Sequence, residues 1–198
     1  MNTLANVIGF GDYRIMIDSK SKIKQILREE KQFYALPKCW RFLAVLGISE
    51  HSIIWRYQSY LRKWEYHLNL HHRIRALFYK YKTTKLGNKH HIFISPNCID
   101  EGLKIFHLGN IMINGKAKIG KNFGVHIGVS IVATNGIDKA AVIGDNCRIG
   151  VGAILIGGIS LGNNIVVGAG SVVTKSFNIN HITLAGVPAK VISDKAEI

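Results

Sequence analysis

The chain has 198 residues, enough for one domain or for a domain with a smaller appendage, which excludes a large multidomain protein. A hydrophobic content of 47% with only 3 prolines excludes a largely disordered chain. The net charge of +14 is uneven, because residues 1–90 carry 17 basic and 6 acidic side chains and residues 91–198 carry 9 and 6. This basic half indicates either an anionic partner, such as a phospholipid surface, an acidic glycan or nucleic acid, or charge that only maintains solubility.

The first half of the chain has the apolar spacing of α-helices. Ser19 can cap a helix that ends before Pro37, and a second short apolar segment ends near Gly47. Ser49 or Ser52 can cap a long helical stretch after it. That stretch has too many aromatic and aliphatic positions for one narrow stripe, which predicts a partner surface in the protein or in another subunit. Its Lys and Arg residues accompany no nucleic-acid-binding motif, so a nucleic-acid partner is not expected.

The second half repeats with a period of six residues. A branched aliphatic residue stands at every sixth position, and a glycine often follows it; the series is Ile113, Ile119, Val125, Ile131, Ile137, Ile143, Ile149, Leu155, Leu161, Val167 and Val173. This pattern is typical of a left-handed parallel β-helix, in which three hexapeptides form a triangular coil and each aliphatic side chain points into the prism. An antiparallel β domain would instead alternate with period two.

Together these patterns predict an α+β protein. Residues 1–88 are expected to form an α-helical N-terminal domain, residues 89–192 a left-handed parallel β-helix, and residues 193–198 a C-terminal tail. The glycine pattern breaks at residues 132–141, which predicts a loop thrown out of one coil, a place where function tends to lie. Three widely spaced cysteines without metal-ligand spacing favour a reducing compartment. A cytoplasmic protein without bound metal is therefore expected, with peripheral attachment to the inner face of the membrane as an addition.

The hexapeptide series and the segment AGVPAKVI at residues 185–192 resemble the hexapeptide-repeat acyltransferases, in particular their serine acetyltransferase branch. The resemblance covers about residues 90–192. It implies a helical domain before the β-helix, association of three chains, and acetyl-CoA binding in the groove between adjacent prisms. The chain length and the residues from Phe78 to Gly115 look most like the serine-acetyltransferase-like enzymes of capsule and exopolysaccharide biosynthesis.

The resemblance also assigns catalytic roles. His107 takes the place of the family's catalytic histidine, and an imidazole with an ordinary pKa near 6.5 can accept the proton of an alcohol that attacks a thioester. Glu101 and Asp100 are the nearest acidic residues that would orient this imidazole, and a backbone carbonyl is a third candidate. His126 is either a second active-site imidazole or a residue of the coil surface.

For acetyl-CoA, the resemblance points to small residues of the later coils, whose backbone can approach the pantetheine arm, and to two lysines that would meet its phosphates. These residues are Val151, Gly152, Gly168, Ala169, Lys175 and Lys190. Direct attack without an acyl-enzyme is expected, because Cys98 and Cys147 look like packing residues and no serine has the setting of a nucleophile.

Three departures from the serine acetyltransferases bear on the acceptor. Where that family has two aspartates near the histidine and an Arg-His pair in the loop, this chain has Phe106, Phe93 and Lys139-Ala140. The groups that would hold an amino acid are largely missing. The sequence therefore predicts an acetyl-CoA-dependent O-acetyltransferase acting on a hydroxyl of a surface polysaccharide, or of an acidic or lipid-linked precursor. The alternatives are a serine O-acetyltransferase of cysteine biosynthesis, an N-acyltransferase for an amino sugar, and a scaffold without activity.

Overall fold

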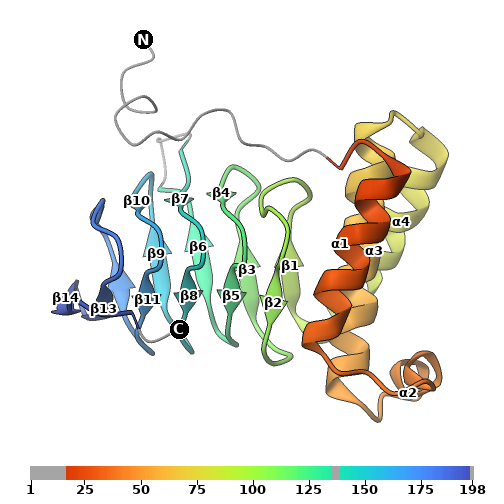
Figure 1. Cartoon of the computed structure of the whole chain (residues 1–198), viewed down its shortest axis with the longest axis horizontal. Helices are drawn as coiled ribbons and strands as arrows, with labels where there is room; N and C mark the ends of the chain where they lie inside the picture. The colour runs from red at the N-terminus through yellow and green to blue at the C-terminus, as the bar shows by residue number, and fades with distance from the viewer. Residues whose placement is uncertain (1–16, 135–138, 197–198) are drawn as a thin grey trace.

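The computed structural model describes residues 17–134 and 139–196, and it shows a helical part followed by a stack of parallel strands (Figure 1). The helices are α1 (Lys20–Phe33), α2 (Trp40–Leu46), α3 (Glu50–Asn69) and α4 (Arg73–His90). Ser19 and Ser49 cap α1 and α3, since each hydroxyl accepts a hydrogen bond from the backbone N–H three residues later.

The long helical stretch predicted after Ser49 is in fact two helices. The chain turns at residues 70–72, where His71 has a φ of 55°, a left-handed conformation that ends a helix. The reversal lays α4 against α3. No proline or glycine marks this turn, which is why the sequence pattern did not reveal it.

The strands form the three faces of a prism, a left-handed parallel β-helix. The first face, sheet A, contains β1 (Ile92–Ile94), β3 (Ile111–Ile113), β6 (Ser130–Val132), β9 (Ile154–Ile156) and β12 (Val172–Val173). Sheet B contains β4 (Lys118–Ile119), β7 (Val142–Ile143) and β10 (Ser160–Leu161). Sheet C contains β2 (Lys104–Ile105), β5 (Gly124–Val125), β8 (Arg148–Ile149), β11 (Val166–Val167), β13 (Thr183–Gly186) and β14 (Ala189–Ser193). All pairs are parallel except β13 with β14, a hairpin at the end of the stack.

The six-residue period is the register of this prism. Every described member of the aliphatic series is at most 4% exposed; Ile137 lies outside the described residues. Ile113 pairs with Ile131, 18 residues later, and Ile131 pairs with Leu155, 24 residues later. The third coil, which begins at β6, thus contains six extra residues, in the predicted loop 132–141. An insertion as long as one hexapeptide left the period unbroken in the sequence.

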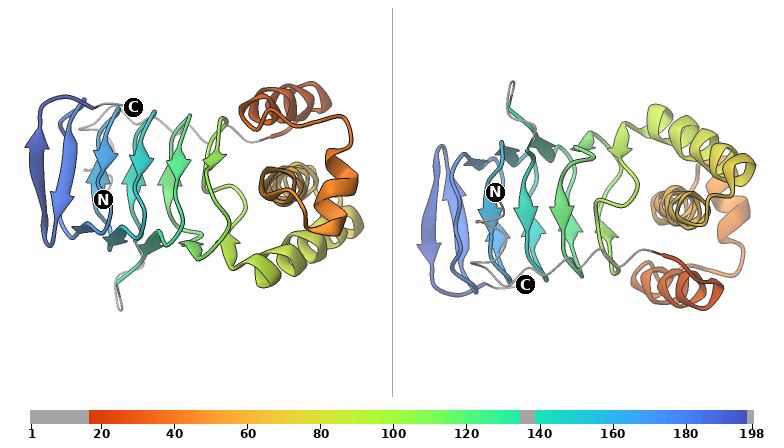
Figure 2. Two further views of the ribbon diagram at one scale, coloured as in Figure 1. Left: turned by 90° about the horizontal axis from the view of Figure 1, so that it is seen from below. Right: turned by 90° about the horizontal axis from the view of Figure 1, so that it is seen from above.

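The helices close the prism at the end where the first coil would otherwise leave unpaired strand edges. α3 lies between α1 and α4 in both views of Figure 2. From α3, the guanidinium of Arg62 is 2.7 Å from Glu30 of α1 and 2.9 Å from Glu65, and it donates to the backbone oxygens of Ile99 and Asp100 in the first coil. This buried network joins two helices to the prism. Within the described part of the chain, no helix has the length and apolar character needed to cross a membrane.

Candidate active site

One edge of the prism collects most of the predicted site residues. It consists of the turns that lead from sheet C to sheet A: residues 106–110, 126–129, 150–153 and 168–171. Backbone hydrogen bonds stack them, from Gly128 N to Asn110 O at 2.7 Å, Gly152 N to Ile127 O at 2.9 Å, and Gly170 N to Val151 O at 2.8 Å. We call this column of turns the C–A edge. His107, His126 and the small residues predicted for acetyl-CoA lie along it in successive coils.

His107 stands at the helical end of the C–A edge, with its side chain 57% exposed. Its Nδ1 lies 3.4 Å from Oε2 of Glu50, and the other carboxylate oxygen of Glu50 accepts the backbone N–H of Leu108 at 2.7 Å. Glu50 is in the first turn of α3. Because the backbone contact fixes the carboxylate beside the ring, Nδ1–H is oriented toward Glu50 and Nε2 is the nitrogen left to act as a base.

The orienting carboxylate is therefore not the one predicted from sequence. Glu101 lies between sheets B and C, where its Oε1 is 2.8 Å from Nζ of Lys121. Glu50 is 57 positions away from His107 in the chain and belongs to another structural region. A search for acidic neighbours in sequence missed it because the contact depends on how α3 docks on the prism. The only sequence signal was its place directly after the capping residue Ser49.

His126 lies one coil further along the edge, with its ring centroid 6.3 Å from that of His107. It stacks face to face on Phe106, at 4.2 Å between centroids. Burial lowers the pKa of His126, and His107 and Arg148 act in the same direction, so the ring is neutral at pH 7. The guanidinium of Arg148 lies over the ring of Phe106. Gly124 leaves space for this ring, because a Cβ on Gly124 would lie only 3.1 Å from it.

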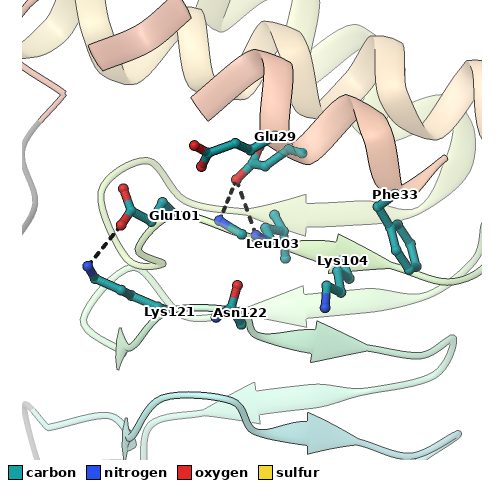
Figure 3. Close-up of a pocket in the computed structure, with 9 residues that line it drawn as sticks. Glu29, Phe33, Glu101, Leu103, Lys104, Lys121 and Asn122 are labelled. Atoms are coloured by element: carbon teal, nitrogen blue, oxygen red, sulfur yellow. Dashed lines mark hydrogen bonds and ion pairs between the residues drawn. The ribbon is translucent and has the colours of Figure 1, made fainter. Parts of the chain in front are cut away.

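A cavity of about 300 Å³ opens between α1 and the first two coils of the prism, near the turns that lead from sheet B to sheet C (Figure 3). Glu29 and Phe33 line it from α1, and Glu101, Lys104, Lys121 and Asn122 line it from the strands and turns below. Phe33 also packs edge-on against Phe106, 5.5 Å away between ring centroids. The cavity is thus joined to the His126 ring through two aromatic side chains.

Comparison with known proteins agrees with this architecture. Residues 141–175 match the family model described as the hexapeptide repeat of succinyl-transferase. The bifunctional protein GlmU of Psychrobacter sp. is 35% identical over 106 residues, which are 52% of this chain and 22% of that protein. GlmU of Neisseria gonorrhoeae is 36% identical over 100 residues, or 50% of this chain and 21% of that protein. The chain thus spans only about a fifth of the length of these relatives.

Solved structures extend the likeness to the helices. A serine acetyltransferase of Brucella abortus matches with a TM-score of 0.67 and 25% identity, covering 91% of this chain and 72% of its own. In its repeat and in its fold, the chain thus resembles the hexapeptide-repeat acyltransferases. The serine acetyltransferase of Neisseria gonorrhoeae, solved in complex with serine, matches with a TM-score of 0.62 and 25% identity over 86% of this chain and 69% of its own. The serine acetyltransferase of Brucella abortus has also been solved in complex with coenzyme A.

Within this fold, the predicted acetyl-CoA residues lie in three places. Val151, Gly152, Gly168 and Ala169 lie on the C–A edge, and Lys190 pairs with Ala185 at the far end of that edge, where a Cβ on Gly168 would meet Ala185. Lys175 follows β12 and therefore lies at the next corner, between sheets A and B, with its Nζ 5.4 Å from the ring of Phe177. The structure does not bring Lys175 to the C–A edge of its own chain.

The three departures from serine acetyltransferases lie at different places. Phe106 is beside His126, as described, whereas Phe93 lies on the outer face of sheet A next to Met112. Lys139 and Ala140 follow the undescribed residues 135–138, and Lys139 lies against the next coil, since a Cβ on Gly158 would meet its side chain. Only the first departure changes the surroundings of His107 within one chain.

The cysteines are not placed for catalysis at the C–A edge. Burial raises the pKa of the Cys98 thiol to about 12 and that of Cys147 to about 11, so both are protonated at neutral pH. Cys39 is exposed at the start of α2. Residues 17–134 and 139–196 contain no group of three or more His, Cys, Asp or Glu side chains that could hold a metal ion.

Proposed function

We propose that the protein is an acetyl-CoA-dependent O-acetyltransferase that modifies a hydroxyl of a surface polysaccharide or of its lipid-linked precursor. The observation that carries the proposal is the setting of His107. Its imidazole is exposed, Glu50 holds its Nδ1 side, and the turns that follow it along the C–A edge are small and open. The three free cysteines suit a reducing compartment, and the proposal places the protein in the cytoplasm.

His107 supplies the base for this reaction. Nε2 takes the proton of the acceptor hydroxyl while its oxygen forms a bond to the carbonyl carbon of the acetyl thioester. The carbon–sulfur bond then breaks, and the imidazolium returns the proton to the departing sulfur of coenzyme A. Glu50 stabilises the imidazolium through Nδ1–H. No protein nucleophile is needed, in agreement with the high pKa values of Cys98 and Cys147.

The C–A edge has the shape required to hold the pantetheine arm of acetyl-CoA. Val151 and Ala169 are exposed, and an added Cβ at Gly152 would have no neighbour within 4 Å. Gly152 has a φ of 68°, so glycine keeps the turn free of a side chain and of strain. Successive coils of such a prism are about 4.8 Å apart, which puts the turn of Gly152 roughly 10 Å from that of His107.

The surroundings of His107 favour a sugar over an amino acid as acceptor. Phe106 presents an aromatic ring where serine acetyltransferases have a carboxylate, and such a ring packs against the apolar face of a sugar. The cavity under α1, whose Phe33 packs against Phe106, offers acidic, amide and ammonium groups for hydroxyls, among them Glu29, Lys104 and Asn122. Arg148, over Phe106, is available for an acidic substituent.

Serine O-acetylation is the second candidate. It is favoured by the solved structures, since serine acetyltransferases match both the helices and the prism of this chain. It is opposed by Phe106 and by the rest of the cluster, which provides no carboxylate for an ammonium group beside His107 other than Glu50, already engaged by Leu108 N–H.

The proposal includes assembly into a trimer. The outer face of sheet A is apolar except at Ser130, with Phe93 and Met112 about half exposed and Ile154, Ile156 and Val172 partly exposed. Apolar side chains in parallel rows are suited to burial against the neighbouring chains around a three-fold axis. Association through sheet A would also bury the exposed ring of Phe93 against a neighbouring chain.

The test is release of free coenzyme A from acetyl-CoA by the full chain, with the capsular oligosaccharide of the source organism in one reaction and L-serine in another. We expect release with the oligosaccharide only. His107→Ala should lower the rate by about 10²- to 10⁴-fold with an unchanged molecular mass. His181→Ala, an exposed histidine far along the prism, is the matched control. Release with serine alone would favour the second candidate, and near-normal turnover by the His107 variant would refute the assigned base.

A further inference from the structure

Helix α4 presents an apolar stripe directly to solvent. Ile74, Leu77, Phe78 and Tyr81 are 88%, 67%, 50% and 57% exposed, and their spacing of three, four and seven residues puts them on one face. The opposite face is buried: Ala76, Thr83 and Gly87 point inward, and Gly87 lies against β1 and Tyr57 of α3. The stripe therefore belongs to a helix whose position is already fixed by the fold.

The same helix is strongly basic. Between Arg73 and His90 there are six Lys or Arg residues and no Asp or Glu. Two of the basic side chains lie beside the stripe, with Lys82 Nζ 5.4 Å from the ring centroid of Phe78 and Lys85 Nζ 5.8 Å from that of Tyr81. Cationic nitrogens and exposed aromatic rings thus share one surface.

We propose that the α4 face, formed by the four stripe residues with Lys82 and Lys85, binds the surface of an anionic phospholipid bilayer. An amphipathic helix lying in the plane of such a surface buries its apolar face among the acyl chains and sets its lysines among the phosphates. A second copy of this chain is a poor partner for the α4 face, because two α4 helices packed on each other would together carry twelve Lys or Arg residues and no Asp or Glu. A soluble polyanion would leave the four apolar side chains in water.

The biological purpose of membrane binding rests on the proposed function, whereas the binding itself does not. If the acceptor is a lipid-linked glycan precursor, docking through α4 brings the enzyme to the surface where the acceptor is concentrated. Binding to the bilayer needs neither acetyl-CoA nor acceptor, so it is measured separately from activity. A failure of the acetyltransferase assay and a failure of membrane binding are therefore distinguishable.

The test is sedimentation of the full chain with vesicles of phosphatidylcholine alone or of phosphatidylcholine mixed with phosphatidylglycerol. We expect binding only to the mixed vesicles, weakened by salt. The variant I74S/F78S should reduce the binding constant by at least tenfold, and K82Q/K85Q by a similar amount, since each charge near an anionic surface contributes about fivefold. The control is I179S/I192S, whose residues are 62% and 65% exposed at the opposite end of the chain.

Three outcomes overturn the proposal. Equal losses in I74S/F78S and I179S/I192S would show that the stripe has no special role. Loss in K82Q/K85Q without loss in I74S/F78S would indicate a soluble polyanion as the partner of α4. A fall in molecular mass of I74S/F78S in the absence of vesicles, measured by light scattering, would assign the α4 face to contact between copies of the chain.

Discussion

The helical part and the prism fill their interiors with different chemistry. Among the described residues, eight polar or charged residues are fully buried, and seven of them lie on the helices: Glu30, Ser52, Gln58, Ser59, Arg62, Glu65 and Thr83. Of these eight, the prism holds Ser171 alone, and its interior is otherwise filled by apolar residues, most of them aliphatic and in register. Burial of apolar area holds the prism together, whereas directed hydrogen bonds and ion pairs fix the position of the helices on it.

That difference explains where the site is built. The repeat supplies a regular edge, but a regular edge carries no unique residue that could orient one histidine. The helices supply that residue, Glu50, at the start of α3. The position of α3 on the prism is fixed in turn by Gln58 and Arg62, which donate hydrogen bonds to the backbone oxygens of Leu103 and Ile99 in the first coil. The geometry at His107 therefore depends on contacts made three helical turns away.

The strongest way to break this arrangement is Arg62→Met. It would leave Glu30 and Glu65 buried without their cation, so we expect the free energy of unfolding to fall by about 3–5 kcal/mol. Urea denaturation measures the loss. Arg56→Met, on the same helix but partly exposed, is the control and should change stability by less than about 0.5 kcal/mol. Equal stability of the two variants would show that the network does not hold α3 in place.

The network cannot be replaced simply by apolar side chains. Besides Arg62, the carboxylate of Glu30 accepts the backbone N–H groups of Gly102 and Leu103, each at 3.1 Å. A triple variant with apolar residues in place of Arg62, Glu30 and Glu65 removes the unpaired charges but leaves these buried donors without a partner. We therefore expect it to recover only part of the stability lost in Arg62→Met.

The fold was largely predictable because its signal is repeated. A period held from Ile113 to Val173 specifies the inward side chain of each strand, and the prediction of a helical region followed by a left-handed β-helix is confirmed. The predicted resemblance to the hexapeptide-repeat acyltransferases is confirmed as well. Structural features that occur only once in the chain, and so have no repeated signal, were harder to predict. The turn at His71 carries no proline or glycine, and nothing in the pattern distinguished α3 followed by α4 from one long helix.

The candidate site was predictable only as far as the repeat extends. His107, His126 and the small residues Val151, Gly152, Gly168 and Ala169 occupy equivalent turns, so spacing by coils places them on one edge. Glu50 was missed, and Glu101 was put in its place, because contact between a helix and a coil does not follow distance along the chain. The roles of these residues in acetyl transfer stay predictions.

A smaller effect is expected from Glu50→Gln, which keeps the size of the side chain but removes its charge. The amide still accepts from Leu108 N–H but stabilises the imidazolium of His107 less well, so we expect kcat for coenzyme A release to fall roughly 10- to 100-fold. KM for acetyl-CoA should not change, since Glu50 is far from the later turns of the C–A edge. Asp194→Asn, at an exposed position, serves as the control. Unchanged kcat would remove Glu50 from the site.

The smallest effect is expected at the ion pair between Lys121 and Glu101, which belongs wholly to the prism. Its side chains are 43% and 25% exposed, so water screens the charges and the pair should contribute less than about 1 kcal/mol. A double-mutant cycle with Lys121→Met and Glu101→Gln measures this coupling in urea, and added salt should weaken it further.

The same variants test whether Lys121 and Glu101 contribute to acceptor binding and not to the stability of the fold. Both side chains line the cavity that Phe33 also lines, and Phe33 packs against Phe106, which stacks on His126. Their charged groups are available there to acceptor hydroxyls. If the cavity binds the acceptor, Lys121→Met raises KM for the oligosaccharide while kcat and the free energy of unfolding stay close to their original values. A coupling energy as large as that expected for Arg62 would contradict this contrast, because it would mean that the prism too depends on a charged pair for its stability.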